Sequence, residues 1–288
     1  MSAAVVAPPG HNLLLGRESF VELRARERAA AILDPGTFRE LLDPFDRVES
    51  PWLVPQGVVP QSDDGTVVGR GAIEAVPAVV LAIEGAFQGG STGEVSGAKI
   101  AGALELALGD AEAGRPIRPV LVLETGGVRL QEANLGLAAV AEINAAIVAL
   151  RRHVPVVGVI AGMVGCFGGM SIAAGLCSRL IVTRQARLGL NGPEVIEQNA
   201  GIAELDSRDR ALVWSIAGGE QRTATGLADE LVEDDAAAIA AAVREAFGAG
   251  LPAVHRSADV ARWLARIAAV DPAQPLDGRT LRTLWQEG

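Results

Sequence analysis

Two glycine pairs occupy positions where main-chain groups could do chemistry. The motif TGGVR at 125–129 follows the apolar run 118–124, and GCFGG at 165–169 follows the apolar run 154–161. Each motif also precedes a helical pattern. The first N–H groups of a helix are unpaired and point outward, and glycine lets a ligand oxygen approach the main chain closely. Two such loops on neighbouring strands would direct N–H groups at one oxygen and stabilise negative charge on it.

This oxyanion hole needs no side chain and suits a reaction whose transition state is an enolate, such as loss of CO2 next to a thioester carbonyl. The alternative is that the glycines only make tight strand-to-helix turns. The candidate catalytic positions are Gly126, Gly127, Val128, Gly168 and Gly169.

Side chains for conventional catalysis are few. His153 lies at a helix end, and His11 and His255 are interpreted as surface residues. Cys166 at a helix start could be a nucleophile, because the helix dipole lowers a thiol pKa, but a small packing residue is the more ordinary role. The chain has no nucleophile elbow, no phosphate-binding loop ending in Gly-Lys-Ser/Thr and no His-Glu-x-x-His motif.

The elements that would position these loops repeat in order. Between 76 and 183, a buried strand, a glycine loop and a helix recur about three times, which predicts an α/β fold with a mainly parallel sheet. The apolar runs 71–75 and 76–84 predict a hairpin before it.

The two ends of the chain differ from this pattern. Residues 1–17 are predicted to be an N-terminal arm, 18–250 the main domain and 251–288 a helical tail. A helix is expected over 19–33 with Ser19 as a possible N-cap, then a turn and a short helix.

Composition excludes several classes of function. The 288 residues carry a net charge of −10, which disfavours nucleic-acid binding. The two cysteines lie apart from any histidine cluster, so no metal site or disulfide framework is predicted. The apolar stretch 154–174 contains Pro155 and several glycines, and favours strand, loop and helix over a membrane span. With no signal peptide at 1–10, a cytoplasmic protein is expected.

Four ordered blocks resemble the β-type carboxyltransferase family, which includes β subunits of bacterial acetyl-CoA carboxylase and of malonate decarboxylase. The blocks are FQGGSTGEVSGAKIAGALELAL (87–108), ETGGVRLQEA (124–133), GCFGGMSIAAGL (165–176) and LGLNGPEVIEQNAG (188–201). Segment 25–41 is also similar. The chain lacks the four-cysteine zinc ribbon usual in acetyl-CoA carboxylase β subunits, and its GCFGG loop looks like that of malonate decarboxylase β subunits.

The resemblance implies a crotonase-like superhelix of ββα units. It also implies that N–H groups around Gly127, Val128, Gly168 and Gly169 hold the thioester oxygen. Arg129, Gln131 and Glu132 would brace the first loop. Residues lining the acyl or pantetheine channel would be Phe87, Gln88, Gly89, Gly90, Ser91 and Phe167.

The function implied by the resemblance is decarboxylation of a malonyl thioester on an acyl carrier protein, in a site shared with a homologous γ-type subunit. A phosphopantetheine-type group or CoA would carry the substrate, and no cofactor would be bound permanently. Arg24, Arg26 and Arg28 are candidates for a basic carrier-docking patch, or for a solvated helix face. A biotin-dependent carboxyltransferase subunit and a non-catalytic scaffold for the partner remain as alternatives.

Overall fold

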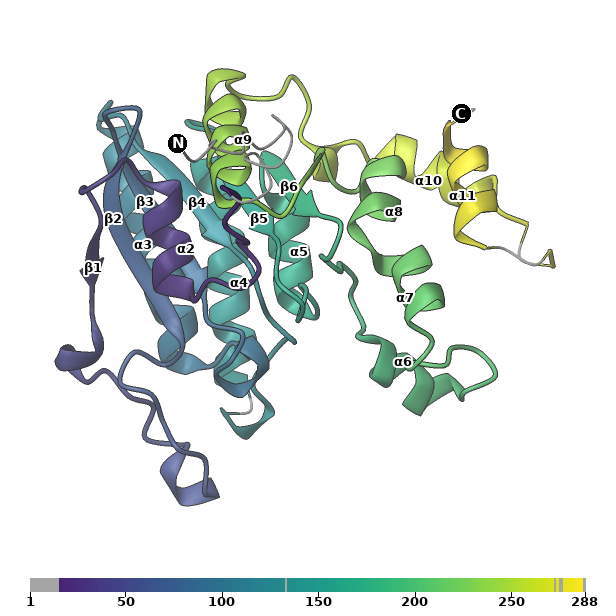
Figure 1. The fold of residues 1–288 in the computed structure, drawn as a ribbon, viewed down its shortest axis with the longest axis horizontal. Coiled ribbons are helices and arrows are strands. Elements are labelled where there is room, and N and C mark those ends of the chain that lie inside the picture. The colour runs from purple at the N-terminus through teal and green to yellow at the C-terminus, as the bar shows by residue number, and fades with distance from the viewer. Residues whose placement is uncertain (1–15, 133, 272, 275–276, 287–288) are drawn as a thin grey trace, which may run out of the picture.

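A seven-stranded sheet with the strand order β1-β2-β3-β4-β5-β6-β7 runs through the molecule (Figure 1). The computed structural model describes residues 16–132, 134–271, 273–274 and 277–286. The first two strand pairs are antiparallel and the other four are parallel. The strands are β1 (Arg39–Leu41), β2 (Thr66–Ile73), β3 (Val76–Ile83), β4 (Arg118–Val122), β5 (Val157–Ile160), β6 (Arg179–Thr183) and β7 (Glu230–Val232).

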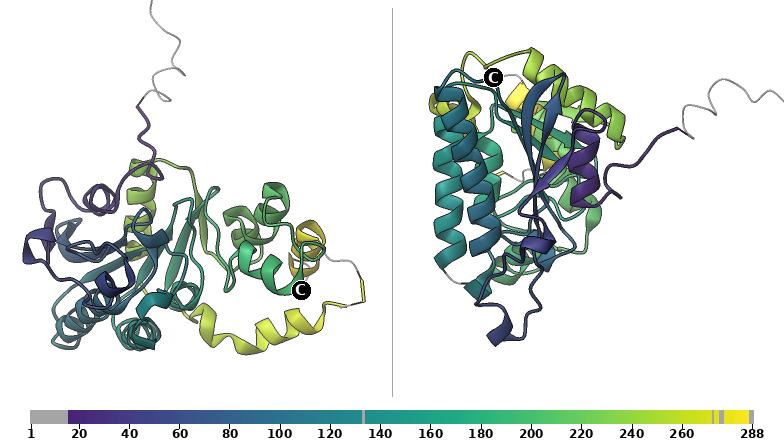
Figure 2. Two further views of the ribbon diagram at one scale, coloured as in Figure 1. Left: turned by 90° about the horizontal axis from the view of Figure 1, so that it is seen from below. Right: turned by 90° about the vertical axis from the view of Figure 1, so that its left-hand side faces the viewer.

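The central residues of the parallel strands are apolar because helices cover both faces of the sheet. One face packs against α3 (Glu94–Glu112), α4 (Asn134–Leu150) and α5 (Gly169–Leu176). The other packs against α2 (Ala25–Ile32) and α9 (Ala236–Gly248). Figure 2 shows α3 and α4 side by side on one side of the sheet, with α2 and α9 on the opposite side. This three-layer arrangement confirms the predicted α/β class and the hairpin, which is formed by β2 and β3.

Five helices from the second half of the chain lie beside the sheet, to the right in Figure 1. Helix α11 contacts both α7 and α8. Within the described residues, no helix is long and apolar enough to cross a membrane. The helices of this group are α6 (Pro193–Ala200), α7 (Arg210–Ala217), α8 (Gly219–Ala224), α10 (Val260–Ala268) and α11 (Gly278–Gln286).

The predicted helix over 19–33 is wrong at its start, because α2 begins six residues later. Ser19 Oγ donates a hydrogen bond to Asp234 at 2.6 Å, and the N–H of Val21 donates to the same carboxylate at 2.9 Å. These bonds hold the segment in an extended path against the start of α9. Long-range contacts to Asp234, invisible in the local pattern, therefore override the N-cap signal of Ser19.

The short helix predicted after the turn at 34–36 is also wrong. Residues 39–41 form the edge strand β1, which pairs with β2. The turn itself is present, because the N–H of Thr37 donates to the carbonyl of Asp34 at 3.0 Å. The edge of β2 favours a strand here, because its main-chain N–H and C=O groups bond to residues 39–41. A segment of three residues is too short to form such bonds within a helix of its own. Most of the predicted arm 1–17, with His11, lies outside the described residues.

Candidate active site

The two glycine loops contact each other at the carboxyl edge of the parallel sheet. A parallel bridge pairs Thr125 with Cys166, and the N–H of Phe167 donates to the Thr125 carbonyl at 3.0 Å. Gly127 has φ +123° and Gly168 has φ +64°, values that other residues rarely adopt. A Cβ added to Gly168 would lie 2.9 Å from the Gly127 Cα. The close approach therefore requires glycine at Gly168, whereas at Gly127 it is the positive φ that favours glycine.

Hydrogen bonds within the chain occupy three of the five main-chain N–H groups at these positions. The N–H of Gly126 donates to Gly89 O at 2.9 Å, and that of Gly127 donates to Thr125 Oγ1 at 3.1 Å. The N–H of Gly168 donates to Leu190 O at 2.8 Å. The N–H groups of Val128 and Gly169 differ from these three. Among the residues that the structure describes, neither donates a hydrogen bond to a turn, loop or helix-cap carbonyl.

The surroundings of these two amides explain why neither is bonded within the chain. Val128 forms a parallel bridge with Thr92, whose bonds use the carbonyl of Gly127 and the N–H of Arg129. The N–H of Val128 therefore points away from Thr92. Gly169 is the first residue of α5, so its N–H is one of the unpaired donors at a helix start and lies at the positive end of the helix dipole.

The predicted channel loop, residues 87–91, is tied to the first glycine loop. Gln88, Gly89 and Gly90 all have positive φ, between +51° and +67°. A Cβ on Gly90 would overlap the carbonyl of Glu124, so only glycine allows this approach. Gln88 and Gly89 are exposed, Ser91 is half-buried and Phe87 is buried. The structure thus brings the two predicted segments together.

Arg129 connects these loops from beneath and is almost completely buried. Its Nη1 lies 2.5 Å from Asp64 Oδ1 and 3.1 Å from Glu132 Oε2. Nε donates to Ser91 Oγ at 3.1 Å and Nη2 donates to Ser91 O at 2.8 Å. The guanidinium carbon lies 5.2 Å from the centre of the Phe87 ring. Burial raises the pKa of Asp64, and the charge of Arg129 opposes that rise.

A second buried ion pair, Arg28–Glu124, supports the loop after β5. Glu124 Oε2 pairs with Arg28, and Oε1 accepts the N–H of Val164 at 3.3 Å. A Cβ on Gly162 would overlap this carboxylate. Sequence reasoning did not identify Glu124, although a charged residue ending an otherwise apolar strand, directly before a glycine loop, was a usable signal.

The same pairs rule out the predicted basic patch. Arg28 is buried with Glu124, and Arg26 is paired with Glu40 and Asp63. Only Arg24 is exposed. The arginines alternate at 24, 26 and 28, which suggested a solvated basic face, but α2 lies on the sheet and directs Arg26 and Arg28 at acidic partners.

Arg187 braces the second glycine loop from the other side. Its Nη2 donates to the carbonyl of Met163 at 2.7 Å. Its guanidinium carbon lies 5.6 Å from the ring centre of Phe167 and 4.9 Å from that of Trp214. Phe167 is only 4% exposed, so its ring supports the loop from within.

Neither cysteine is available as a nucleophile. Cys166 and Cys177 are 0% and 1% exposed. Burial raises the pKa of both thiols, to about 12 for Cys177, so neither forms a thiolate near neutral pH. We expect a thiol reagent such as DTNB to leave the native protein unmodified and to react with both thiols once urea unfolds it. Rapid labelling of the native chain would contradict this burial.

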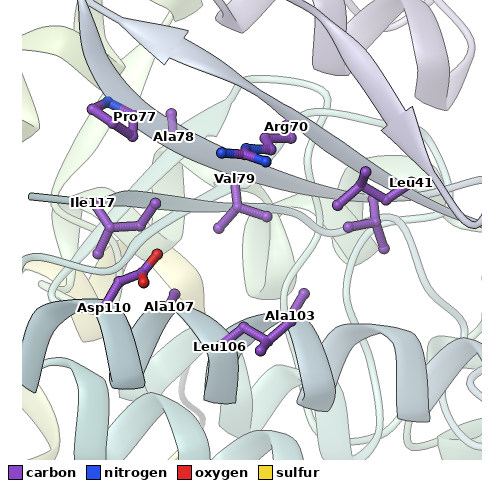
Figure 3. A pocket seen from close by; sticks show the side chains of 11 residues that line it. Leu41, Arg70, Pro77, Ala78, Val79, Ala103, Leu106, Ala107, Asp110 and Ile117 are labelled. Carbon is purple, nitrogen blue, oxygen red and sulfur yellow. The ribbon is translucent and has the colours of Figure 1, made fainter. Parts of the chain in front are cut away.

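A hollow between the hairpin and α3 is unrelated to these loops. It has a volume of about 270 Å³, and Figure 3 shows Pro77, Ala78 and Val79 on the strand facing Ala107 and Asp110 on the helix. It lies near the amino ends of β3 and β4. Ligands of parallel sheets bind at the carboxyl ends, where the glycine loops are.

Large apolar side chains are exposed around the glycine loops. Leu130 is 85% exposed, and other exposed residues flank the loops on α4, α5 and the segment before α6. Exposed apolar groups of this kind are typical of surfaces that bind another protein, a ligand or a membrane. Its members are Leu130, Leu135, Leu137, Met163, Ile172 and Leu190.

Known proteins are similar to this chain in sequence and in fold. Residues 21–280 match the carboxyl transferase domain family. The malonyl-S-ACP:biotin-protein carboxyltransferase MADC of Malonomonas rubra is 45% identical over 227 residues, which are 75% of this chain and 71% of the relative.

Two solved structures are also similar. In a Pseudomonas malonate decarboxylase hetero-tetramer in complex with malonate, one chain superposes with a TM-score of 0.93 and 63% identity, covering 96% of this chain and 100% of that one. A chain of the Pseudomonas malonate decarboxylase MdcD-MdcE hetero-dimer has a TM-score of 0.76 and 58% identity, covering 88% and 98%.

The fold and the paired glycine loops define a crotonase-like α/β protein. The chain belongs to the carboxyl transferase family.

Proposed function

We propose that this chain is the β-type subunit of a malonate decarboxylase, which with a homologous γ-type subunit converts a malonyl thioester on an acyl carrier protein into an acetyl thioester and CO2. The observation that carries the proposal is the pair of free N–H groups, Val128 and Gly169, on two loops in contact. The names and identities of the two Pseudomonas structures and of the Malonomonas relative support the substrate class.

The two amides would bind the thioester carbonyl oxygen. As the bond to the carboxylate carbon breaks, its electron pair forms the enolate and places negative charge on that oxygen. CO2 leaves, and a proton then adds to carbon. Because the N–H groups are fixed before the reaction, they stabilise this charge with no reorganisation, and each donor contributes about 3–4 kcal/mol to the transition state.

The other predicted positions keep supporting roles in this scheme. Since the N–H groups of Gly126, Gly127 and Gly168 are engaged within the chain, these glycines would shape the hole and not donate to the substrate. Gln88, Gly89 and Ser91 would line the channel for the phosphopantetheine-type arm. No permanently bound cofactor is part of the proposal.

The exposed apolar group around the loops fits a partner that completes the site. Both Pseudomonas structures are named as hetero-oligomers, which supports a second subunit here. We expect the complex to release CO2 from malonyl thioester and this chain alone to do so far more slowly. Full activity of the isolated chain would contradict a shared site.

A biotin-dependent carboxyltransferase is the second candidate, because the Malonomonas relative is named for transfer to a biotin protein. The higher identity to the Pseudomonas decarboxylase chains, 63% against 45%, favours the decarboxylase. Avidin separates the two. A decarboxylase complex remains active with avidin present, whereas a biotin-dependent transferase stops.

A further inference from the structure

The hollow between the β2–β3 hairpin and α3 is a candidate binding site that the proposed reaction does not use. It has a volume of about 270 Å³, close to the lower end of the range for small-molecule sites. We call it the hairpin hollow (Figure 3). The side chains of Val68 and Val79 form its sheet side, and those of Ala103 and Leu106 form its helix side. A ligand here would be a second one, distinct from the thioester at the glycine loops.

The apolar wall of the hairpin hollow is partly uncovered. Leu106 on α3 is 74% exposed and Leu41 on the edge strand β1 is 43% exposed, and both line the hollow. Val68 and Val79 between them are buried. A hydrocarbon chain in the hollow would remove the surface of Leu106 and Leu41 from water, and that burial favours binding.

Two arginines stand directly opposite each other on the strands that border the hollow. Arg70 lines the hollow, and the register of β1 and β2 pairs it with Arg39. Directly opposed residues of an antiparallel pair carry their side chains on the same face of the sheet. Like charges at such positions destabilise the pair. An anion bound by both arginines would relieve this repulsion.

The acidic residues nearest to this arginine pair bind other cations. Glu40 alternates to the opposite face of β1, where its Oε2 lies 2.7 Å from Arg26 Nε. Asp110 lines the hollow from α3, but its Oδ1 accepts hydrogen bonds from Nε and Nη2 of Arg115, at 2.9 and 2.6 Å. Within the described part of the chain, neither arginine of the opposed pair has a carboxylate within ion-pair distance. Both guanidinium groups are therefore available to a ligand.

We propose that the hairpin hollow binds an aliphatic carboxylic acid, such as a medium-chain fatty acid. Its carboxylate would lie between Arg39 and Arg70, because a guanidinium group binds a carboxylate through parallel charged hydrogen bonds. Its hydrocarbon chain would lie along Leu106. A small anion without a chain, such as malonate, would leave this apolar surface exposed. The inference is independent of the proposed function, since the hollow lies near the amino ends of β3 and β4 and the glycine loops lie at the carboxyl ends.

Isothermal titration calorimetry on the complete hetero-oligomer tests the site, with octanoate as the probe. We expect saturable octanoate binding to the wild type, and binding about tenfold weaker in Arg70→Gln, the effect of one charged hydrogen bond. Acetate, which lacks the chain, and octanol, which lacks the charge, should each bind far more weakly than octanoate. Arg208→Gln is the matched control, because Arg208 is exposed, pairs with Asp206 and does not line the hollow.

The Arg70→Gln protein is expected to fold normally, because Arg70 is exposed and its replacement removes the repulsion from Arg39. Its urea midpoint should therefore not fall below that of the wild type. The inference is overturned if octanoate does not bind the wild type, or if Arg70→Gln binds it as tightly as Arg208→Gln does. Competition between octanoate and malonyl-CoA would also overturn it, since the acid would then occupy the glycine loops. So would binding to the isolated chain but not to the hetero-oligomer, which would make the hollow a subunit contact.

Discussion

Replacing Gly168 with alanine is expected to lower kcat for malonyl-thioester decarboxylation by about 100- to 1,000-fold, the loss associated with one oxyanion donor. The new Cβ would lie 2.9 Å from the Gly127 Cα, so the two glycine loops must separate. This separation moves the N–H groups of Val128 and Gly169 apart. A small displacement is sufficient to lower kcat, because both groups must donate to the same oxygen. The measurement is CO2 release by the hetero-oligomer at saturating malonyl-CoA.

The same substitution has a smaller effect on stability. Gly168 has φ +64° and ψ −150°, a conformation that costs a residue with a side chain about 1–3 kcal/mol. The folded chain and its complex are expected to persist, which circular dichroism and size-exclusion chromatography would verify. The activity loss is then a property of the site and not of unfolding.

Gly175→Ala is the matched control. Gly175 lies on the same helix, α5, and a Cβ there meets nothing within 4 Å. Alanine is also the better helix former. Near-wild-type activity in this control together with near-wild-type activity in Gly168→Ala would leave the glycines as turn residues and favour the scaffold alternative.

The sheet was predictable from the sequence because its strands are short apolar runs separated by glycines. The runs 118–124 and 154–161 contain β4 and β5, and the hairpin falls where β2 and β3 pair. A continuous apolar run indicates a strand that is buried on both faces, and such burial is usual in parallel sheets. Predictions failed where a partner far along the chain decides the structure, as Asp234 does for Ser19.

The contact between the two glycine loops was predictable from the sequence, but the hydrogen bonds of their N–H groups were not. Glycine pairs and strand order placed Gly127 beside Gly168. The identity of the free N–H groups depends on acceptors such as Leu190 O and Gly89 O, which the tertiary structure supplies. The buried partner Asp64 was missed for the same reason. A carboxylate in a polar turn gives no sign that it will face a buried arginine.

Replacement of Arg129 with methionine is expected to reduce the free energy of unfolding by about 3–5 kcal/mol, since it leaves two buried carboxylates without their cation. Asp64 and Glu132 side chains are fully buried, and Glu132 Oε1 already lacks a hydrogen-bond partner within the described residues. Equilibrium urea unfolding at neutral pH measures the loss. Arg115→Met, which breaks an exposed pair with Asp110, should cost less than about 1 kcal/mol.

Neutralising Asp64 and Glu132 shows how much of the stability loss in Arg129→Met comes from uncompensated charge and how much from lost packing. In the Arg129→Met background, Asp64→Asn with Glu132→Gln should recover part of the lost stability, because the uncompensated charge is removed. It should not restore activity, since neither amide can bridge Ser91 to the first glycine loop as the guanidinium does. If Arg129→Met and the Arg115→Met control unfold at the same urea concentration, the prediction is wrong. The 87–91 loop and the first glycine loop would then stay in contact without the Arg129 cation. The main-chain bonds between Gly126 and Gly89 and between Thr92 and Gly127 would then suffice.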